Sequence, residues 1–402
     1  MSEVDEKKIH KLYGKKKRRV SYQSGDFLDY IIMSLFCAFT LYLTFGPDAI
    51  ISIVGLVICA FMVVIFPFRH GMEFKIPMIL RRPQEILYTI IHKILSIKLV
   101  YLLSVGLLLL ENYLIFLTPD LHHNVKLMRE IAIWLFYIHF ISITLYRTYI
   151  LVCHLNKKEH VRTVLMESVW KNQLLKTKSI TLEIWHAYFT GILTHILLIA
   201  PWYLVITYLN FSILFLPLIF ILNILIQWIF LKKINEMFYR EHWLGHNAEI
   251  DFVYFHGPHH DAIPSALIGV AGNGFLEGPS RGVISFPTPF YNPILAMLLY
   301  TIEIKGDMDI HQYIPGVFPT LPREFMEVTQ HSRHHFGKVE PLGFAIKVEK
   351  SNPSEFIQKR FKFFPDEFKN SAILDEQLNE FKWENSDHKW YLNLVDKYGK
   401  NT

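Results

Sequence analysis

Residues 27–68 read FLDYIIMSLFCAFTLYLTFGPDAIISIVGLVICAFMVVIFPF, two long apolar runs separated by Gly46-Pro47-Asp48. The runs are Phe27–Gly46 and Ala49–Phe68, and each is close to the roughly 20 residues that a helix needs to cross a bilayer. Gly, Pro and Asp together favour a tight turn. This stretch therefore predicts a pair of membrane-spanning helices joined as a hairpin.

Four more apolar runs have spanning length: Leu99–Leu117, Ile131–Leu155, Ile184–Tyr208 and Phe211–Leu231. Leu209-Asn210 is a short connection, so the last two runs predict a second hairpin. Over 402 residues, 51% are hydrophobic and 19% are charged, whereas soluble domains carry about 25% charged residues. The sequence predicts an all-α integral membrane protein with six transmembrane helices.

The basic residues of the loops give an independent prediction of orientation. Eight Lys and Arg lie between Lys7 and Arg19, a cluster that could bind nucleic acid but is more typical of a cytoplasmic flank. The loops after the second and fourth runs are also basic, and the turns after the first and fifth contain no Lys or Arg. This alternation predicts that both termini are cytoplasmic. No signal peptide is predicted, and three cysteines within apolar runs indicate neither a disulfide framework nor a thiolate metal site.

A shorter segment, Glu85–Ile97, repeats apolar residues at helical spacing while Glu85, His92 and Lys93 fall elsewhere. Pro83 suits the start of a helix. Two interpretations remain open: an amphipathic helix in the cytoplasmic interface, or an extension of the third span.

The chain divides by composition into four parts. Residues 1–26 form a basic cytoplasmic tail, and residues 27–180 a four-helix membrane region with a cytoplasmic loop and no assigned role. Residues 181–345 join the 184–231 hairpin to a region, 233–345, that is rich in His, Gly and Pro. Residues 346–402 form a charged cytoplasmic tail. No nucleic-acid partner is predicted.

Nine histidines in residues 233–345 form an ordered pattern of H-x-x-x-H, H-x-x-H-H, one intermediate His and H-x-x-H-H: His242, His246, His256, His259, His260, His311, His331, His334 and His335. On a helix, residues three and four apart share one face, so each box directs its imidazoles to one place. A single zinc site needs three or four ligands. Nine ligands fit two metal ions, held in a helical cytoplasmic cap. Asp251 and other nearby carboxylates could orient the imidazoles.

The run from Glu241 to Phe344 resembles the catalytic domain of the fatty acid hydroxylase and sterol desaturase superfamily, which includes the sterol C4-methyl oxidases. The three boxes carry the resemblance. Glu277 lies near a family Glu, and Asp309-Ile-His311-Gln-Tyr313-Ile-Pro315 looks like the family's Asp-x-His-x-Gly-Tyr-x-x-Pro element. The chain departs from the pattern at Gln312, where the family has Gly, and at Glu340-Pro-Leu-Gly343, where it has Asn-Tyr-Gly.

The resemblance implies a non-haem di-iron centre, with zinc as a substitute in preparations, that uses dioxygen to hydroxylate a C–H bond of a lipid such as an acyl chain or sterol. Electrons would come from an external donor, either a cytochrome b5-like protein or a ferredoxin–reductase system, because the chain has no haem, nucleotide or iron–sulfur motif. No catalytic residue beyond the metal ligands is predicted. Residues predicted for the second coordination shell or the lipid pocket are Asp261, Glu277, Asp309, Tyr313 and His195, the last of which could instead bond between helices.

Three rival functions stay open. Membrane desaturases use similar boxes, and the short gap between His246 and His256 favours the hydroxylase branch. A metal carrier should place its ligands within the spans, whereas these follow the last one. A metal-dependent lipid hydrolase would mix carboxylates with histidine.

Overall fold

The apolar runs form helices in a computed structural model, which describes residues 27–70, 80, 83–96, 98–118, 120, 122–156, 188–189, 191–192, 207–247, 251, 255 and 294. The helices are α3 (Phe27–Phe45), α4 (Ile50–His70), α6 (Pro83–Ser96), α7 (Lys98–Leu117), α8 (His122–Asn156) and α11 (Leu216–Asn247). These residues contain no strand. The all-α prediction is confirmed for this part of the chain.

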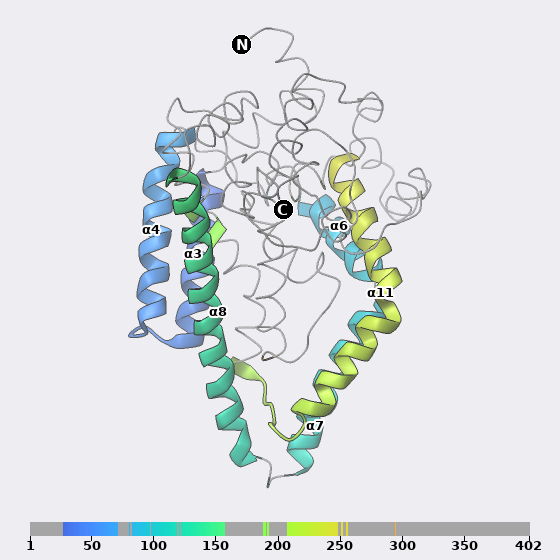
Figure 1. Ribbon diagram of the computed structural model, residues 1–402. Helices are drawn as coiled ribbons and strands as arrows, with labels where there is room; N and C mark the ends of the chain where they lie inside the picture. Colours follow the sequence, from blue (N-terminus) through green and yellow to red (C-terminus); the bar gives the residue numbers. More distant parts are fainter. Residues whose placement is uncertain are drawn as a thin grey trace.

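Helices α3 and α4 form the predicted hairpin and lie side by side (Figure 1). The turn begins at Gly46, whose φ of 84° lies in the left-handed region that glycine adopts without strain. Its amide donates to the carbonyl of Tyr42 at 2.9 Å and closes the end of α3. Across the pair, the thiol of Cys59 donates to the carbonyl of Ser34 at 3.1 Å. Both cysteines of the hairpin are buried packing residues.

In the part of the chain that the structure describes, two helices are long and apolar enough to cross a membrane: Lys98–Leu117 in α7 and Val125–Tyr149 in α8. The segments Leu216–Ile226 and Trp228–His242 of α11 make a third if they count as one span, although the helix bends by 53° between them. Asn223 donates to the carbonyl of Ile219 at 2.9 Å, one turn before this bend, and a side chain that competes for a helix carbonyl favours bending. In the hairpin, Ser34–Phe45 and Ile50–Phe61 are shorter apolar helices.

Two predicted boundaries are wrong. The sequence predicts the fourth span at Ile131–Leu155, but α8 already begins at His122 and its membrane-compatible stretch ends at Tyr149. It predicts the sixth span at Phe211–Leu231, but residues 211–215 precede the helix, with a turn at 213–215, and α11 continues to Asn247. The reason for the second difference lies in Ser212, whose hydroxyl accepts the amide of Leu214 at 3.3 Å and stabilises the turn. Most of the fifth predicted span, Ile184–Tyr208, lies outside the described residues.

Helix α8 exposes a large apolar face and buries two ionisable side chains, His139 and Arg147. Its buried residues recur at helical spacing: Ala132, Phe136, His139, Ile143, Arg147 and Leu151. Its exposed residues are large and apolar: Trp134, Ile138, Ile141, Leu145 and Tyr149. A helix in water shows the opposite arrangement. Lipid around the outer face explains this pattern and agrees with the predicted membrane class.

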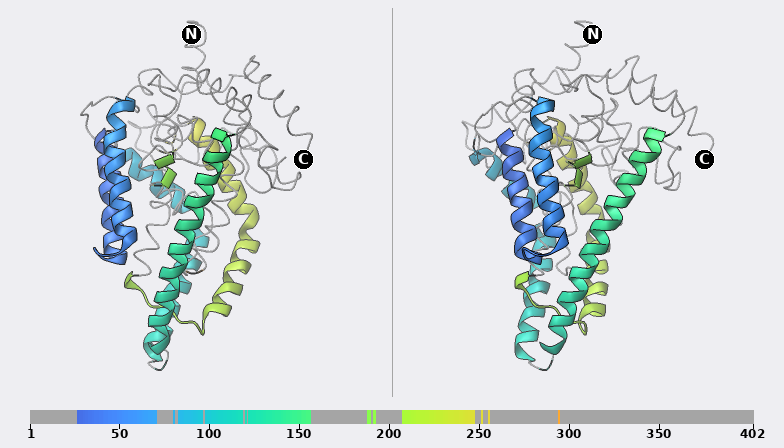
Figure 2. Two further views of the ribbon diagram at one scale, coloured as in Figure 1. Left: turned by 60° about the vertical axis from the view of Figure 1, so that its left-hand side comes forward. Right: turned by 90° about the vertical axis from the view of Figure 1, so that its left-hand side faces the viewer.

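The helices run between two ends of the molecule (Figures 1 and 2). The end of α4, all of α6, the end of α8 and the last turns of α11 lie toward one end. The end of α7, the start of α8 and the start of α11 lie toward the other. Helix α11 packs along α7 through a cluster of Val100, Ile234 and Met237. This pairing places the first histidine box beside α6.

Candidate metal centre and its buried ion network

The first histidine box occupies the last turns of α11. His242 is 7% exposed, and its ring lies 5.9 Å from that of Phe238 in an edge-on arrangement. His246 follows one turn later in the same helix, where residues i and i+4 lie on one face. Leu244, between them, is fully buried. Box one is therefore held in a packed part of the chain rather than on a surface helix.

The other predicted ligands lie outside the described residues: His256, His259, His260, His311, His331, His334 and His335. The same holds for Asp261, Glu277, Asp309, Tyr313 and His195. Within the described residues, no three His, Cys, Asp or Glu side chains gather as metal ligands would. His242 is the one predicted ligand whose side chain can be placed, and the dinuclear site stays a prediction.

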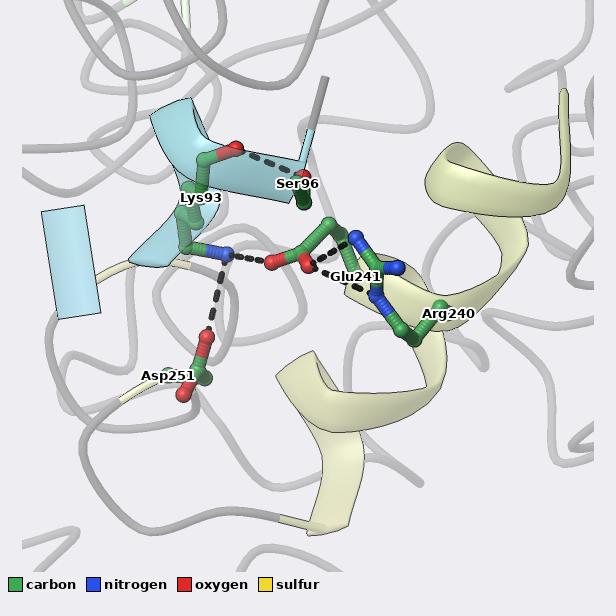
Figure 3. A network of polar contacts seen from close by, with 5 residues as sticks. All are labelled: Lys93, Ser96, Arg240, Glu241 and Asp251. Carbon is green, nitrogen blue, oxygen red and sulfur yellow. Dashed lines mark hydrogen bonds and ion pairs between the residues drawn. The ribbon is translucent and has the colours of Figure 1, made fainter. Parts of the chain in front are cut away.

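A buried ion network adjoins box one (Figure 3). The ammonium of Lys93, from α6, lies 2.6 Å from Oε2 of Glu241 and 3.0 Å from Oδ1 of Asp251. Arg240 donates to the other oxygen of Glu241 through Nη2 at 3.0 Å and through Nε at 3.1 Å. The Lys93, Glu241 and Asp251 side chains are 5% exposed or less. Among the described residues, two cations thus face two carboxylates.

The electrostatics of this network constrain what it can do. Burying a charge is costly unless it is paired, and removing one partner of a buried pair typically costs about 3–5 kcal/mol. Both carboxylates beside box one are already engaged by cations. They are therefore better suited to fixing the position of the chain than to ligating a metal.

Lys93 also lies over the ring of Phe255, with 5.5 Å between Nζ and the ring centroid. Glu241 directly precedes His242, and Phe255 directly precedes His256. The ammonium of Lys93 therefore contacts the residue directly before His242, in box one, and the residue directly before His256, in box two. The hydroxyl of Ser96 donates to the carbonyl of Lys93 at 2.6 Å and caps the end of α6.

From the sequence, Lys93 is predicted only to lie off the apolar face of the helix that became α6. In the structure, the polar residues Glu85, Thr89 and Lys93 of this helix are buried, and they follow one another at spacings of four residues. Its exposed residues are mostly apolar, namely Leu87, Tyr88, Ile91 and Leu95. The helix over this segment is confirmed, and it ends at Ser96, separate from α7. The i, i+4, i+8 spacing of polar residues was the available signal for a buried polar face.

The chain shortly before His195 contacts α8. The hydroxyls of Thr148 and Tyr188 lie 2.7 Å apart. Gly191 packs so closely on the guanidinium of Arg147 that a methyl group on Gly191 would overlap it. Arg147 is fully buried. Tyr188 and Gly191 therefore join α8 through one hydrogen bond and one close contact, neither of which was predicted.

The chain was compared with protein-family models, with curated proteins and with solved structures. None of them matches. The resemblance to the fatty acid hydroxylase and sterol desaturase superfamily consequently rests on the histidine boxes and the motifs around them.

Proposed function

We propose that this protein is a membrane-bound di-iron oxygenase that hydroxylates a C–H bond of a lipid with dioxygen and external electrons. The observation that supports it most is the position of box one. His242 is buried in the last turns of a helix whose earlier part is apolar enough to lie in a membrane. A lipid could therefore reach the site while its tail stays in an apolar environment.

The donor chemistry of box one fits an iron site. Neutral imidazole is a good ligand for iron, and the i, i+4 positions of His242 and His246 are compatible with a shared metal. The bound iron pair would supply the activation of dioxygen that amino-acid side chains cannot provide. Lys93 and Arg240 already bind the carboxylate of Glu241, which favours imidazole as the donor type of the proposed site. His256, His259, His260, His311, His331, His334 and His335 would complete the set.

The surroundings of box one would exclude water and orient the chain. Ile234 and Met237 pack against Val100 of α7 just before His242. The proposed cytoplasmic location of the site follows from the basic loops, and the gathering of the ends of α4, α8 and α11 with α6 supports it (Figures 1 and 2). Six crossings would then place both termini on that side. Electrons would arrive from a cytochrome b5-like or ferredoxin-type donor.

The proposal is tested by lipid mass spectrometry on membranes that contain the wild type or a His259→Ala, His334→Ala double variant. Isotopically labelled dioxygen and a competent reductase are supplied. A labelled hydroxyl on one lipid class, absent in the variant, is expected. Loss of two hydrogens without label would replace the hydroxylase by a desaturase, and two bound metals with no lipid change would point to a metal-binding protein instead.

A further inference from the structure

We infer that Lys93 is a positioning residue of the proposed metal centre, which sets the distance between the first and second histidine boxes. This inference rests on the proposed function. It concerns a residue of the N-terminal region, to which the sequence assigned no role.

The geometry that carries the inference is a three-way contact. Nζ of Lys93 lies 2.6 Å from Glu241, 3.0 Å from Asp251 and 5.5 Å from the ring centroid of Phe255. Glu241 belongs to α11 and precedes His242, whereas Asp251 and Phe255 belong to the segment that leads to His256. The ammonium therefore joins the two segments that carry boxes one and two.

The charges explain why these segments need a cation between them. Glu241 and Asp251 are both buried and carry like charge when ionised. At short range in a low-dielectric interior, like charges repel strongly. Arg240 binds the outer oxygen of Glu241 at 3.0 Å. The oxygen that faces Asp251 across the cluster is the one held by Lys93 (Figure 3).

Helix α6 provides a firm support for this ammonium. Its inner face is buried through Glu85, Thr89 and Lys93, while Leu87 and Leu95 on its outer face are 56% and 52% exposed. An apolar outer face of this kind suits the membrane interface. The helix would lie between lipid and the histidine boxes. Because α6 is held at the membrane, Lys93 would hold the segments that carry boxes one and two at a fixed place relative to the membrane.

Lys93 could matter only because it compensates the buried negative charges, and the same contacts would then be seen. The test must therefore separate this compensation from the physical link between the two segments. Lys93→Met removes both the charge and the bridge. Lys93→Met combined with Asp251→Asn leaves Arg240 beside Glu241; it removes one charge of each sign and so keeps the net charge of the wild type, but not the bridge. Lys98→Met is the matched control, because Lys98 begins the adjacent helix and is exposed.

The full chain is purified in lipid nanodiscs and loaded with Fe²⁺ or, as a redox-inert probe, Zn²⁺. Metal stoichiometry, the rate of metal loss to a chelator, and the thermal unfolding midpoint are measured for each variant. Loss of an outer-shell contact weakens metal binding by about 10–100-fold in known sites. We therefore expect Lys93→Met to release metal at least about tenfold faster and Lys98→Met to behave as the wild type.

The double variant decides the inference. We expect the unfolding midpoint to recover, because the net charge of the cluster is again that of the wild type. We expect metal retention not to recover, because the link between the two segments is still absent. Recovery of both would overturn the inference, since neutralisation alone would then suffice. If Lys93→Met does not fold, Lys93→Arg serves: it keeps the charge but places a planar group where one nitrogen meets three partners, and wild-type metal retention in it would overturn the inference.

The wild type separates this inference from the proposed function. A wild type that binds no metal would overturn both. A wild type that holds two metals, together with a folded Lys93→Met variant that holds them equally tightly, would overturn the inference and leave the proposed function standing.

Discussion

The two ends of the α7–α11 pair bury acidic side chains in different ways. At the α6 end, Glu241 and Asp251 are held by the cations Lys93 and Arg240. At the other end, Glu111 is 3% exposed and accepts the backbone amide of Ser212 at 3.2 Å. No cation contacts Glu111 within the described residues.

The difference separates a charge network from a backbone anchor. Next to Glu111, the side-chain oxygen of Asn112 accepts the amide of Asn210 at 3.0 Å. Both contacts hold the turn before α11 by accepting backbone amides. A neutral side-chain acceptor could do the same at either position. The Lys93 network instead links segments that are 148 residues apart in sequence. Substitutions that remove a charge but keep the hydrogen-bond acceptor should therefore be tolerated at the Glu111 end, whereas loss of charge at the Lys93 end should not be.

Lys93→Met should have the largest effect on stability. Removing one partner of a buried ion pair costs about 3–5 kcal/mol in free energy of unfolding, because the opposite charges stay buried. The measurement is unfolding of the purified protein with a denaturing detergent. Lys98→Met should change the free energy by less than about 0.5 kcal/mol, as exposed substitutions usually do. Equal effects of the two substitutions would mean that the network contributes no specific stability.

The helices around this network were predictable to different degrees. The bounds of α7 agree with the prediction to within a residue, because the apolar run is bordered by Lys98 and ends at Leu117. The end of α11 was missed because the helix becomes amphipathic beyond the apolar run: Lys232, Lys233 and Glu236 are exposed, while Ile234 and Met237 are buried. Apolar length marks the membrane-compatible stretch, whereas the helix itself ends at Asn247.

The site was predictable only where its signal is local. The spacing of His242 and His246 can be read from adjacent turns of one helix. The contact between Lys93 and Glu241 depends on how two distant helices pack, and no short-range pattern encodes it. The four-residue spacing of Glu85, Thr89 and Lys93 was a signal for a buried polar face, but this face was not predicted and the spacing does not identify its partners.

Glu111→Ala should have the second-largest effect on stability. It would leave the buried amide of Ser212, whose side chain is fully buried, without its acceptor. An unsatisfied buried donor costs about 1–3 kcal/mol. Glu111→Gln is the matched variant, because its amide oxygen can accept the same hydrogen bond without a charge. Unfolding of both should show that glutamine recovers most of the loss. An equal loss in both variants would show that the charge is required here too.

Lys126→Met should have the smallest effect on stability. It represents an exposed ion pair, against which the buried Lys93 network is compared. Lys126 and Glu130 form an i, i+4 pair on α8 at 3.9 Å, with side chains 87% and 57% exposed. Such pairs contribute about 0.3–0.5 kcal/mol in free energy of unfolding, and salt screens them. The substitution should therefore lower stability slightly at low salt and not at all in about 1 M salt, where the screening length is roughly 3 Å.

The loss of stability caused by Lys93→Met should persist at the same salt concentration, because its charges are shielded from the solvent. If salt removed that deficit as well, the Lys93 network would behave as a surface pair, and α6 could not fix the position of the histidine boxes in the way inferred here.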